Sequence, residues 1–155
     1  GSADKRVILL LGSKNSNCAR DLLDEHSAAS FNRLYGGAKV TINRLSGQYQ
    51  GRCRAVVHNG LVYAVATDTS GSPTLAEQTR RTLEALERNL VDAGSGKSGL
   101  LQVTVYLRNM SGKSEMDTVW CDWVGSADNW PQRACVGADL AGETQVEIVA
   151  TAAVL

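Results

Sequence analysis

Two residues near the C-terminal end of the chain, Arg133 and Glu147, are the strongest candidates for chemistry. Arg133 follows a Trp-Pro-Gln segment and begins an apolar stretch, and Glu147 is the lone acidic residue of a Val-Glu-Ile segment. A charged side chain in an apolar strand loses contact with water, which costs free energy unless a ligand or partner compensates. Because a guanidinium can hold a carboxylate through two parallel hydrogen bonds, Arg133 is predicted to bind one. The alternative is a structural ion pair between Arg133 and Glu147 across neighbouring strands.

The composition limits the partners that such a site could serve. Lys plus Arg and Asp plus Glu balance at 16 each, so the chain lacks the excess positive charge that binds a phosphate backbone. No apolar run approaches the roughly 20 residues that span a bilayer. The four cysteines and two histidines show neither a CxxC pair nor a zinc-ligand spacing. We therefore expect no nucleic-acid partner, no membrane association, no metal site and a reducing, cytoplasmic location.

Residues 38–155 carry the periodic patterns of one α+β domain, which must position these side chains. Asn59-Gly60 between two apolar runs predicts a tight hairpin. Thr74 and Glu77 have the spacing of a capping box, and apolar residues at steps of three and four then predict a long amphipathic helix. The predicted order is β-β-β-α-β-α-β-β, with strands at 39–44, 54–58, 61–67, 100–107, 133–140 and 145–154 and helices at 75–93 and 113–124.

This order predicts how the domain is layered. Strands that follow one another and then pair across helices favour a mixed sheet with both helices on one face. The other face would expose apolar residues in a monomer, so self-association is expected. Residues 1–37 precede the domain as an extension of unknown role, with a possible helix at 19–34. The basic residues of the long helix are expected to form a solvated face with its glutamates: Arg80, Arg81 and Arg88 with Glu84 and Glu87.

Several motifs of the domain together resemble the Rid/YjgF family of reactive intermediate deaminases. The family pattern Pro-x-Arg-x-x-Val, a short loop and a Val/Ile-Glu-Ile strand matches the segments around Arg133 and Glu147. The resemblance covers roughly residues 39–155. Upstream it includes Gly-Gln-Tyr at 47–49, Asn-Gly-Leu-Val-Tyr at 59–63, the helix at 78–94 and Val-Thr-Val-Tyr-Leu at 103–107.

The resemblance implies a chorismate-mutase-like fold and a homotrimer whose sheets enclose a central barrel, with active sites between subunits. It also implies hydrolysis of enamines or imines that carry a carboxylate, to a keto acid and ammonia, without a cofactor. Arg133 would bind the carboxylate of this small metabolite, Glu147 would orient a water or relay a proton, and Tyr49 would close the pocket from across the subunit boundary. Trp130 and Cys135 would line the substrate site, with Cys135 as a small strand residue rather than a nucleophile.

The chain departs from the family pattern after the third predicted strand. Archetypal members carry Ser-Gly-Gln there, whereas this chain reads Val-Ala-Thr-Asp-Thr at 65–69. Thr67 or Thr69 is the candidate replacement for the serine hydroxyl that contacts substrate. The departure leaves open a different imine or reaction, or a non-catalytic protein that binds a small metabolite. RNA cleavage, which is also attached to the family, is least favoured because the net charge is zero and no histidine pair is available for acid–base work.

Overall fold

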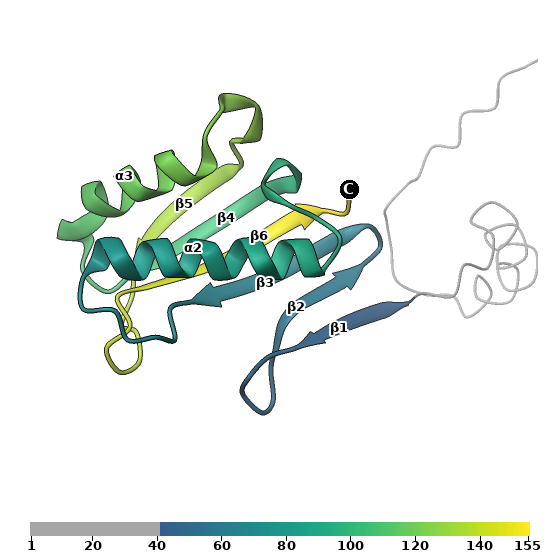
Figure 1. Ribbon diagram of the computed structural model, residues 1–155, viewed down its shortest axis with the longest axis horizontal. Coiled ribbons are helices and arrows are strands. Elements are labelled where there is room, and N and C mark those ends of the chain that lie inside the picture. The colour runs from purple at the N-terminus through teal and green to yellow at the C-terminus, as the bar shows by residue number, and fades with distance from the viewer. Residues whose placement is uncertain (1–40) are drawn as a thin grey trace, which may run out of the picture. The chain divides into compact units, whose positions relative to one another are not determined.

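The computed structural model describes residues 41–155, which form one mixed sheet with two helices on one of its faces (Figure 1). The strands are β1 (Ile42–Ser46), β2 (Cys53–His58), β3 (Leu61–Thr67), β4 (Leu100–Leu107), β5 (Gln132–Gly137) and β6 (Val146–Ala153). The helices are α2 (Leu75–Asp92) and α3 (Lys113–Val124), and short 3-10 turns are η1 (Lys97–Gly99), η2 (Met110–Gly112) and η3 (Ala127–Asn129). The predicted α+β class and element order are confirmed, while the predicted helix at 19–34 lies outside the described residues.

The sheet order is β1-β2-β3-β6-β4-β5, and within it only β4 and β5 pair in parallel. The β2–β3 reversal is the predicted tight turn, with positive φ angles at both Asn59 and Gly60. β4 lies between β5, which carries Arg133, and β6, which carries Glu147. Within one copy of the chain the alternative of an Arg133–Glu147 ion pair across neighbouring strands is wrong, because the last strand pairs between β3 and β4 instead of beside β5. A pair between copies that holds a trimer together stays a prediction.

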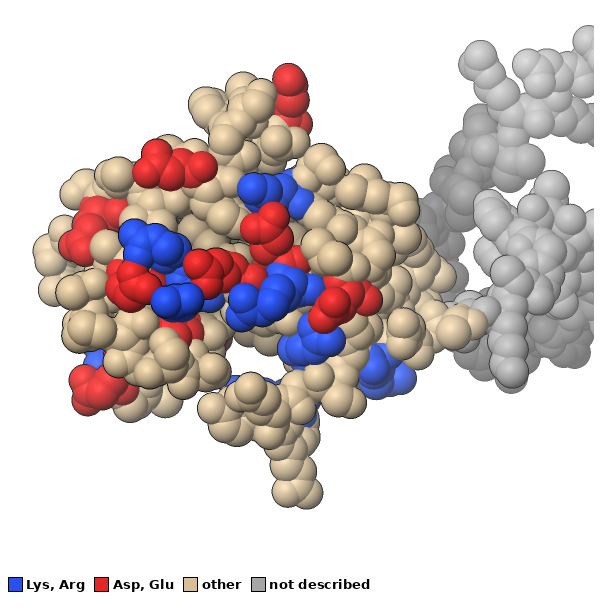
Figure 2. All heavy atoms as spheres, viewed as in Figure 1, with Lys and Arg blue, Asp and Glu red and all other residues tan. Residues whose placement is uncertain are grey.

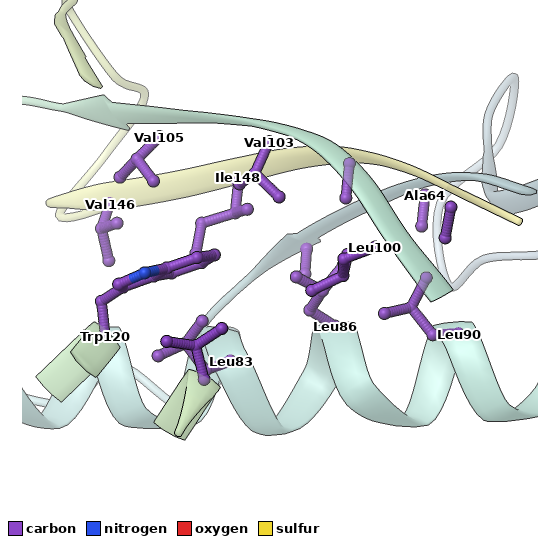
Figure 3. Packing of buried hydrophobic residues seen from close by; sticks show 14 of the residues in the cluster. Ala64, Leu83, Leu86, Leu90, Leu100, Val103, Val105, Trp120, Val146 and Ile148 are labelled. Atoms are coloured by element: carbon purple, nitrogen blue, oxygen red, sulfur yellow. The ribbon is translucent and has the colours of Figure 1, made fainter. Parts of the chain in front are cut away.

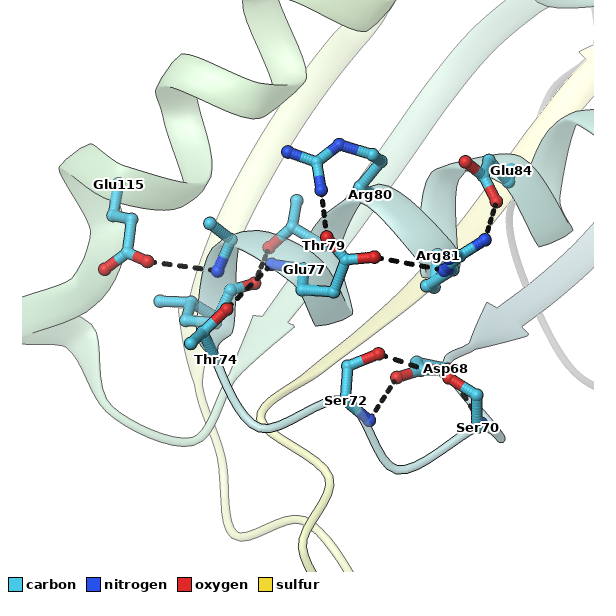
Figure 4. A network of polar contacts seen from close by, with 12 residues as sticks. Asp68, Ser70, Ser72, Thr74, Glu77, Thr79, Arg80, Arg81, Glu84 and Glu115 are labelled. Atoms are coloured by element: carbon cyan, nitrogen blue, oxygen red, sulfur yellow. Dashed lines mark hydrogen bonds and ion pairs between the residues drawn. The ribbon is translucent and has the colours of Figure 1, made fainter.

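Helix α2 begins at the predicted cap, but the capping box forms only in part. The Thr74 hydroxyl accepts a hydrogen bond from the Glu77 backbone N–H at 3.2 Å, as Figure 4 shows. The Glu77 carboxylate pairs with Arg80 and Arg81 rather than with the backbone of Thr74. The Glu115 carboxylate of α3 accepts instead from the first-turn N–H of Ala76 at 3.0 Å. A carboxylate at this helix end is favourable, because the N-terminal N–H groups carry partial positive charge.

The core lies between the helices and one face of the sheet (Figure 3). Side chains one turn apart on α2 point at the strands, because residues three and four apart share a helix face. Each fully buried aliphatic side chain contributes roughly 1.5–3 kcal/mol. The labelled contacts come from α2 (Leu83, Leu86, Leu90), α3 (Trp120), β3 (Ala64), β4 (Leu100, Val103, Val105) and β6 (Val146, Ile148).

The opposite face of the sheet has no helix over it among the described residues, and it carries exposed apolar side chains. Tyr63 of β3 is 47% exposed, Val149 of β6 42% and Val136 of β5 44%. An apolar sheet face of this kind favours a contact with another surface. No helix in the described part of the chain is long and apolar enough to cross a membrane.

Candidate functional site

A cavity of about 470 Å³, here called the β3 cavity, opens where the β1–β2 hairpin separates from β3. β2 pairs with β3 only along residues 61–64 of β3, so the last residues of that strand, 65–67, lie beyond the ladder. The cavity occupies the space left there and is bounded by the 46–54 segment of the hairpin, by α2 and by the start of β6. Figure 2 shows the surface hollowed between α2 and the projecting β1–β2 loop.

Tyr49, Thr67 and Glu147 of the predicted site line this cavity, together with Thr69, the other candidate replacement for the serine hydroxyl. Thr67 and Glu147 are direct partners across β3 and β6, so their side chains share one face of the sheet. The Thr67 hydroxyl donates to the Val146 carbonyl at 3.2 Å. Tyr49 is 54% exposed, and the guanidinium of Arg52 lies 4.4 Å from its ring centroid. The sequence thus identified three residues, far apart along the chain, that the fold brings together.

The Glu147 carboxylate makes no hydrogen bond or ion pair with any residue that the structure describes. It is half-buried at the start of β6 and borders the cavity. A partly desolvated carboxylate without a partner is a ready acceptor for a water, an N–H group or a proton.

The wall between the hairpin and α2 is held by Arg54. Its Nη1 donates to the Asn89 side-chain oxygen at 3.0 Å and to the Asp92 carboxylate at 2.8 Å, and its Nε donates to the Ser46 carbonyl at 3.2 Å. The Asn89 amide in turn donates to the Val65 carbonyl at 2.9 Å, beyond the end of the β2–β3 ladder. These bonds satisfy part of the free strand edge and join the hairpin to α2 along the cavity wall.

Arg133 lies elsewhere, on the helix-covered face of β5. Its Nη2 donates to the Asp117 carboxylate at 2.5 Å, its Nη1 lies 3.8 Å from the Met116 sulfur, and its guanidinium lies 5.1 Å from the Trp120 ring centroid. Glu147 faces the other side, since its neighbour Ile148 points into the core beneath the helices and strand side chains alternate. Within one copy of the chain, Arg133 and Glu147 therefore do not meet.

Asp117 is shared between two cations, because the Lys113 ammonium contacts its other oxygen at 2.5 Å. Partial burial would raise the pKa of the Asp117 carboxyl, but hydrogen bonds and charges from Lys113 and Arg133 outweigh it and lower that pKa. The three groups together carry one net positive charge. This group of Lys113, Asp117 and Arg133, here called the Arg133 cluster, holds the guanidinium in place and leaves some of its N–H donors unused. Its net positive charge favours an anion.

A model of the family described as Endoribonuclease L-PSP matches residues 41–154. The chain belongs to this family. The predicted resemblance to Rid/YjgF proteins, the same family under another name, is thereby confirmed. A RutC family protein of Haemophilus ducreyi is 38% identical over 100 residues, which span 63% of this chain and 85% of the relative. The RutC family protein YoaB of Escherichia coli is 33% identical over 100 residues, spanning 64% and 87%.

Solved structures support the same assignment. The YjgF family member NMB1025 from Neisseria meningitidis superposes with a TM-score of 0.69 at 36% identity, over 74% of this chain and 95% of its own. An uncharacterized protein from Pseudomonas aeruginosa gives a TM-score of 0.68 at 28% identity, over 73% and 98%. The α+β fold derived from the sequence pattern is thus the fold of solved YjgF relatives.

Two other predicted site residues of this YjgF family member lie near Arg133 in sequence but outside the β3 cavity. Cys135 is half-buried against the core, and burial raises the pKa of its thiol, which suits a packing residue better than a nucleophile. Trp130 is 65% exposed and donates its indole N–H to the Gly125 carbonyl at 3.0 Å. That either residue contacts substrate stays a prediction.

Sequence reasoning missed six charged residues near these sites, Lys113 and Asp117 beside Arg133 and Arg52, Arg54, Arg88 and Asp92 along the β3 cavity. Lys113 and Asp117 have the i, i+4 spacing of a helical ion pair, a signal that predicts their contact but not the third partner on β5. Arg52 and Arg88 line the β3 cavity without a sequence signal, because the hairpin and α2 approach one another only in the folded chain. Among residues 41–155 no three His, Cys, Asp or Glu side chains gather closely enough to hold a metal ion.

Proposed function

We propose that this protein is a cofactor-free deaminase that hydrolyses reactive enamines or imines bearing a carboxylate, to a keto acid and ammonia. The observation that carries the proposal is the unpaired Glu147 carboxylate, which borders a cavity together with Thr67 and Tyr49. Membership of the Rid/YjgF family supports this reaction class. The cavity volume falls within the range of small-molecule sites, roughly 300–1,000 Å³.

A second copy of the chain would complete the site. Arg133 and Glu147 lie on opposite faces of one sheet, so a substrate held by both must lie between copies. The exposed apolar side chains of the open face, Tyr63, Val136 and Val149, favour such self-association. We therefore infer a homotrimer in which the Arg133 cluster of one copy faces the β3 cavity of the next.

In the proposed reaction an enamine first takes a proton from solvent on its terminal carbon and becomes an iminium ion, which is a protonated imine. Arg133 holds the carboxylate, and Glu147 accepts a proton from a water whose oxygen bonds to the imine carbon while the C=N π electrons move to nitrogen. The resulting carbinolamine has one C–O and one C–N single bond. Glu147 then delivers the proton to nitrogen, the C–N bond breaks, and the hydroxyl proton passes to solvent as the carbonyl forms, giving the keto acid and ammonia. Oxidation states balance, so no redox partner enters.

The test is ammonia release from imines that an amino-acid oxidase generates in the same vessel. We expect the wild-type protein to accelerate release, and Glu147→Gln to lower kcat by about 10²- to 10³-fold, because general acid–base catalysis contributes about 10²–10⁴. Arg80→Ala is the matched control, since Arg80 pairs with Glu77 on the outer surface of α2. A wild-type protein that is inert toward a broad panel of imines would rule out the proposal.

The alternative is a non-catalytic protein that binds a small carboxylate. One observation favours it: the Thr67 hydroxyl donates to the Val146 carbonyl and so does not offer its proton to a ligand. In that case carboxylates would raise the melting temperature, by preferential binding to the folded state, without any turnover.

A further inference from the structure

We propose that the β3 cavity binds a second anionic group of the substrate, so that the preferred substrates are imines with two carboxylates, such as those of acidic amino acids. This inference rests on the proposed function and specifies its substrate class. Its basis is a pair of arginines at the cavity, Arg52 and Arg88, that have no carboxylate partner among the described residues.

Arg88 is left unpaired although α2 is rich in acidic residues. Glu84 and Asp92 lie four residues before and after it, at the usual spacing of helical ion pairs. Glu84 pairs with Arg81 at 3.2 Å, which Figure 4 shows, and Asp92 pairs with Arg54 at 2.8 Å. The expected solvated face therefore forms without Arg88.

The other acidic groups around Arg88 are also engaged. Glu87 contacts the Lys97 ammonium at 3.7 Å and accepts from the Trp123 indole at 3.1 Å. Asp68 borders a neighbouring hollow of about 320 Å³ that Arg88 also lines, and its oxygens accept from the N–H groups of Ser70 and Ser72 (Figure 4). Arg88 is thus an exposed residue that lines the cavity, while the acidic side chains of α2 and Asp68 are each held by another donor. The unpaired Glu147 carboxylate also lines the cavity but forms no ion pair with Arg88.

Arg52 places a second guanidinium on the hairpin side of the same cavity. Its contact is with the Tyr49 ring, 4.4 Å from the centroid, and a stacked guanidinium keeps its in-plane N–H donors available. The charged side chains that line the cavity are Arg52, Arg54 and Arg88 against Asp92 and Glu147, three positive and two negative. The cavity therefore carries one net positive charge even with Glu147 ionised.

The two anion-binding regions would divide the substrate between them. The α-carboxylate goes to Arg133 of a neighbouring copy, and the side-chain anion goes to Arg88 and Arg52. Guanidinium–carboxylate hydrogen bonds are charge-assisted and directional, so they discriminate strongly against a neutral side chain. The departure from the Ser-Gly-Gln motif within residues 65–69 agrees with a substrate other than the smallest archetypal one.

The test compares kcat/KM for imines generated from glutamate and from norvaline, which differ in the terminal anion. We expect the glutamate imine to be preferred, and Arg88→Ala to reduce this preference by about 10- to 100-fold, as for loss of a hydrogen bond to a charged group. Arg52→Ala should reduce the preference less, because Arg52 lies on the exposed loop between β1 and β2. Arg88→Lys should keep part of the preference that Arg88→Ala loses. Arg80→Ala, on the outer surface of the same helix, should keep the wild-type ratio.

Equal kcat/KM for the two imines, or an Arg88→Ala protein that loses both activities alike, would overturn the inference. If no imine is hydrolysed, the proposed function fails separately, and binding then decides the question. Calorimetry with glutarate and butyrate should show tighter binding of glutarate that Arg88→Ala abolishes. Equal affinity for these two acids would again overturn the inference.

Discussion

The β3 cavity and the Arg133 cluster both contain charged side chains, but these are paired with opposite charges to different extents. Around Arg133, Asp117 joins two cations at 2.5 Å each, so the guanidinium is fixed before any ligand arrives. In the cavity, Glu147, Arg52 and Arg88 have no partner of opposite charge among the described residues. In the proposed site, the Arg133 guanidinium would be a rigid anchor, and the unpaired groups of the cavity would be free to contact a ligand.

The largest expected effect would show whether the two regions form one site between copies. Arg133→Ala and Glu147→Gln chains should each be nearly inactive as homotrimers. Refolded together at equal amounts, they should regain about a quarter of the wild-type activity per site, because in a cyclic trimer a cleft then has both intact residues with probability one half times one half. Ammonia release measures the recovery.

A site formed within single copies would show no recovery on mixing. Sedimentation of each variant alone provides the control that assembly is intact. A monomeric wild-type protein would also contradict the shared site.

The next effect concerns the rigidity of the anchor. Asp117→Asn removes the carboxylate that positions the Arg133 guanidinium, and we expect kcat to fall about tenfold with a smaller change in KM, since misplacing a bound group by about 1 Å can cost up to 10²-fold. Lys113→Gln keeps the Asp117–Arg133 contact, so its kcat should fall less. Equal losses of kcat in the two variants would contradict this positioning role, because Lys113→Gln leaves the Asp117–Arg133 contact in place.

A smaller effect is expected in the wall of the cavity. Arg54→Ala removes two hydrogen bonds to Asn89 and Asp92 of α2 and one to the Ser46 carbonyl of the hairpin. We expect the free energy of unfolding to fall by about 1–2 kcal/mol, because these charged contacts are exposed or partly buried. Chemical denaturation measures this change. Because the Arg133 cluster is untouched, carboxylate binding there should survive, and its loss would mean that the two regions are coupled.

The smallest effect is the pH dependence of the loop beside the cavity. Partial burial would raise the pKa of Asp68, but hydrogen bonds from Ser70 and Ser72 lower it to about 2. A carboxyl with a lowered folded-state pKa stabilises the protein above its unfolded value, near 3.8, and this contribution disappears as the pH falls through about 2. The melting temperature of Asp68→Asn should therefore lie below wild type at pH 5 and approach it near pH 2.

Asp139→Asn is the matched control, because Asp139 is exposed and lies outside this loop. A gap between wild type and Asp68→Asn that stays constant from pH 5 to pH 2 would contradict the assignment. In that case the asparagine would act through the shape of the loop.

The sequence by itself determined the elements, their order and the family. Periodicity, the Asn59-Gly60 turn and the Thr74 cap depend on residues only a few positions apart, so local patterns are sufficient to predict them. The motif around Arg133 and Glu147 likewise identified the family.

Only the tertiary structure decided which charges meet. The insertion of β6 between β3 and β4 separates Arg133 from Glu147. The approach of the hairpin to α2 allows Arg54 to form an ion pair with Asp92. As a result Arg88 forms no ion pair with a carboxylate of the described residues. Charge pairing depends on distances of a few ångströms between segments remote in sequence, and strand order and packing set those distances.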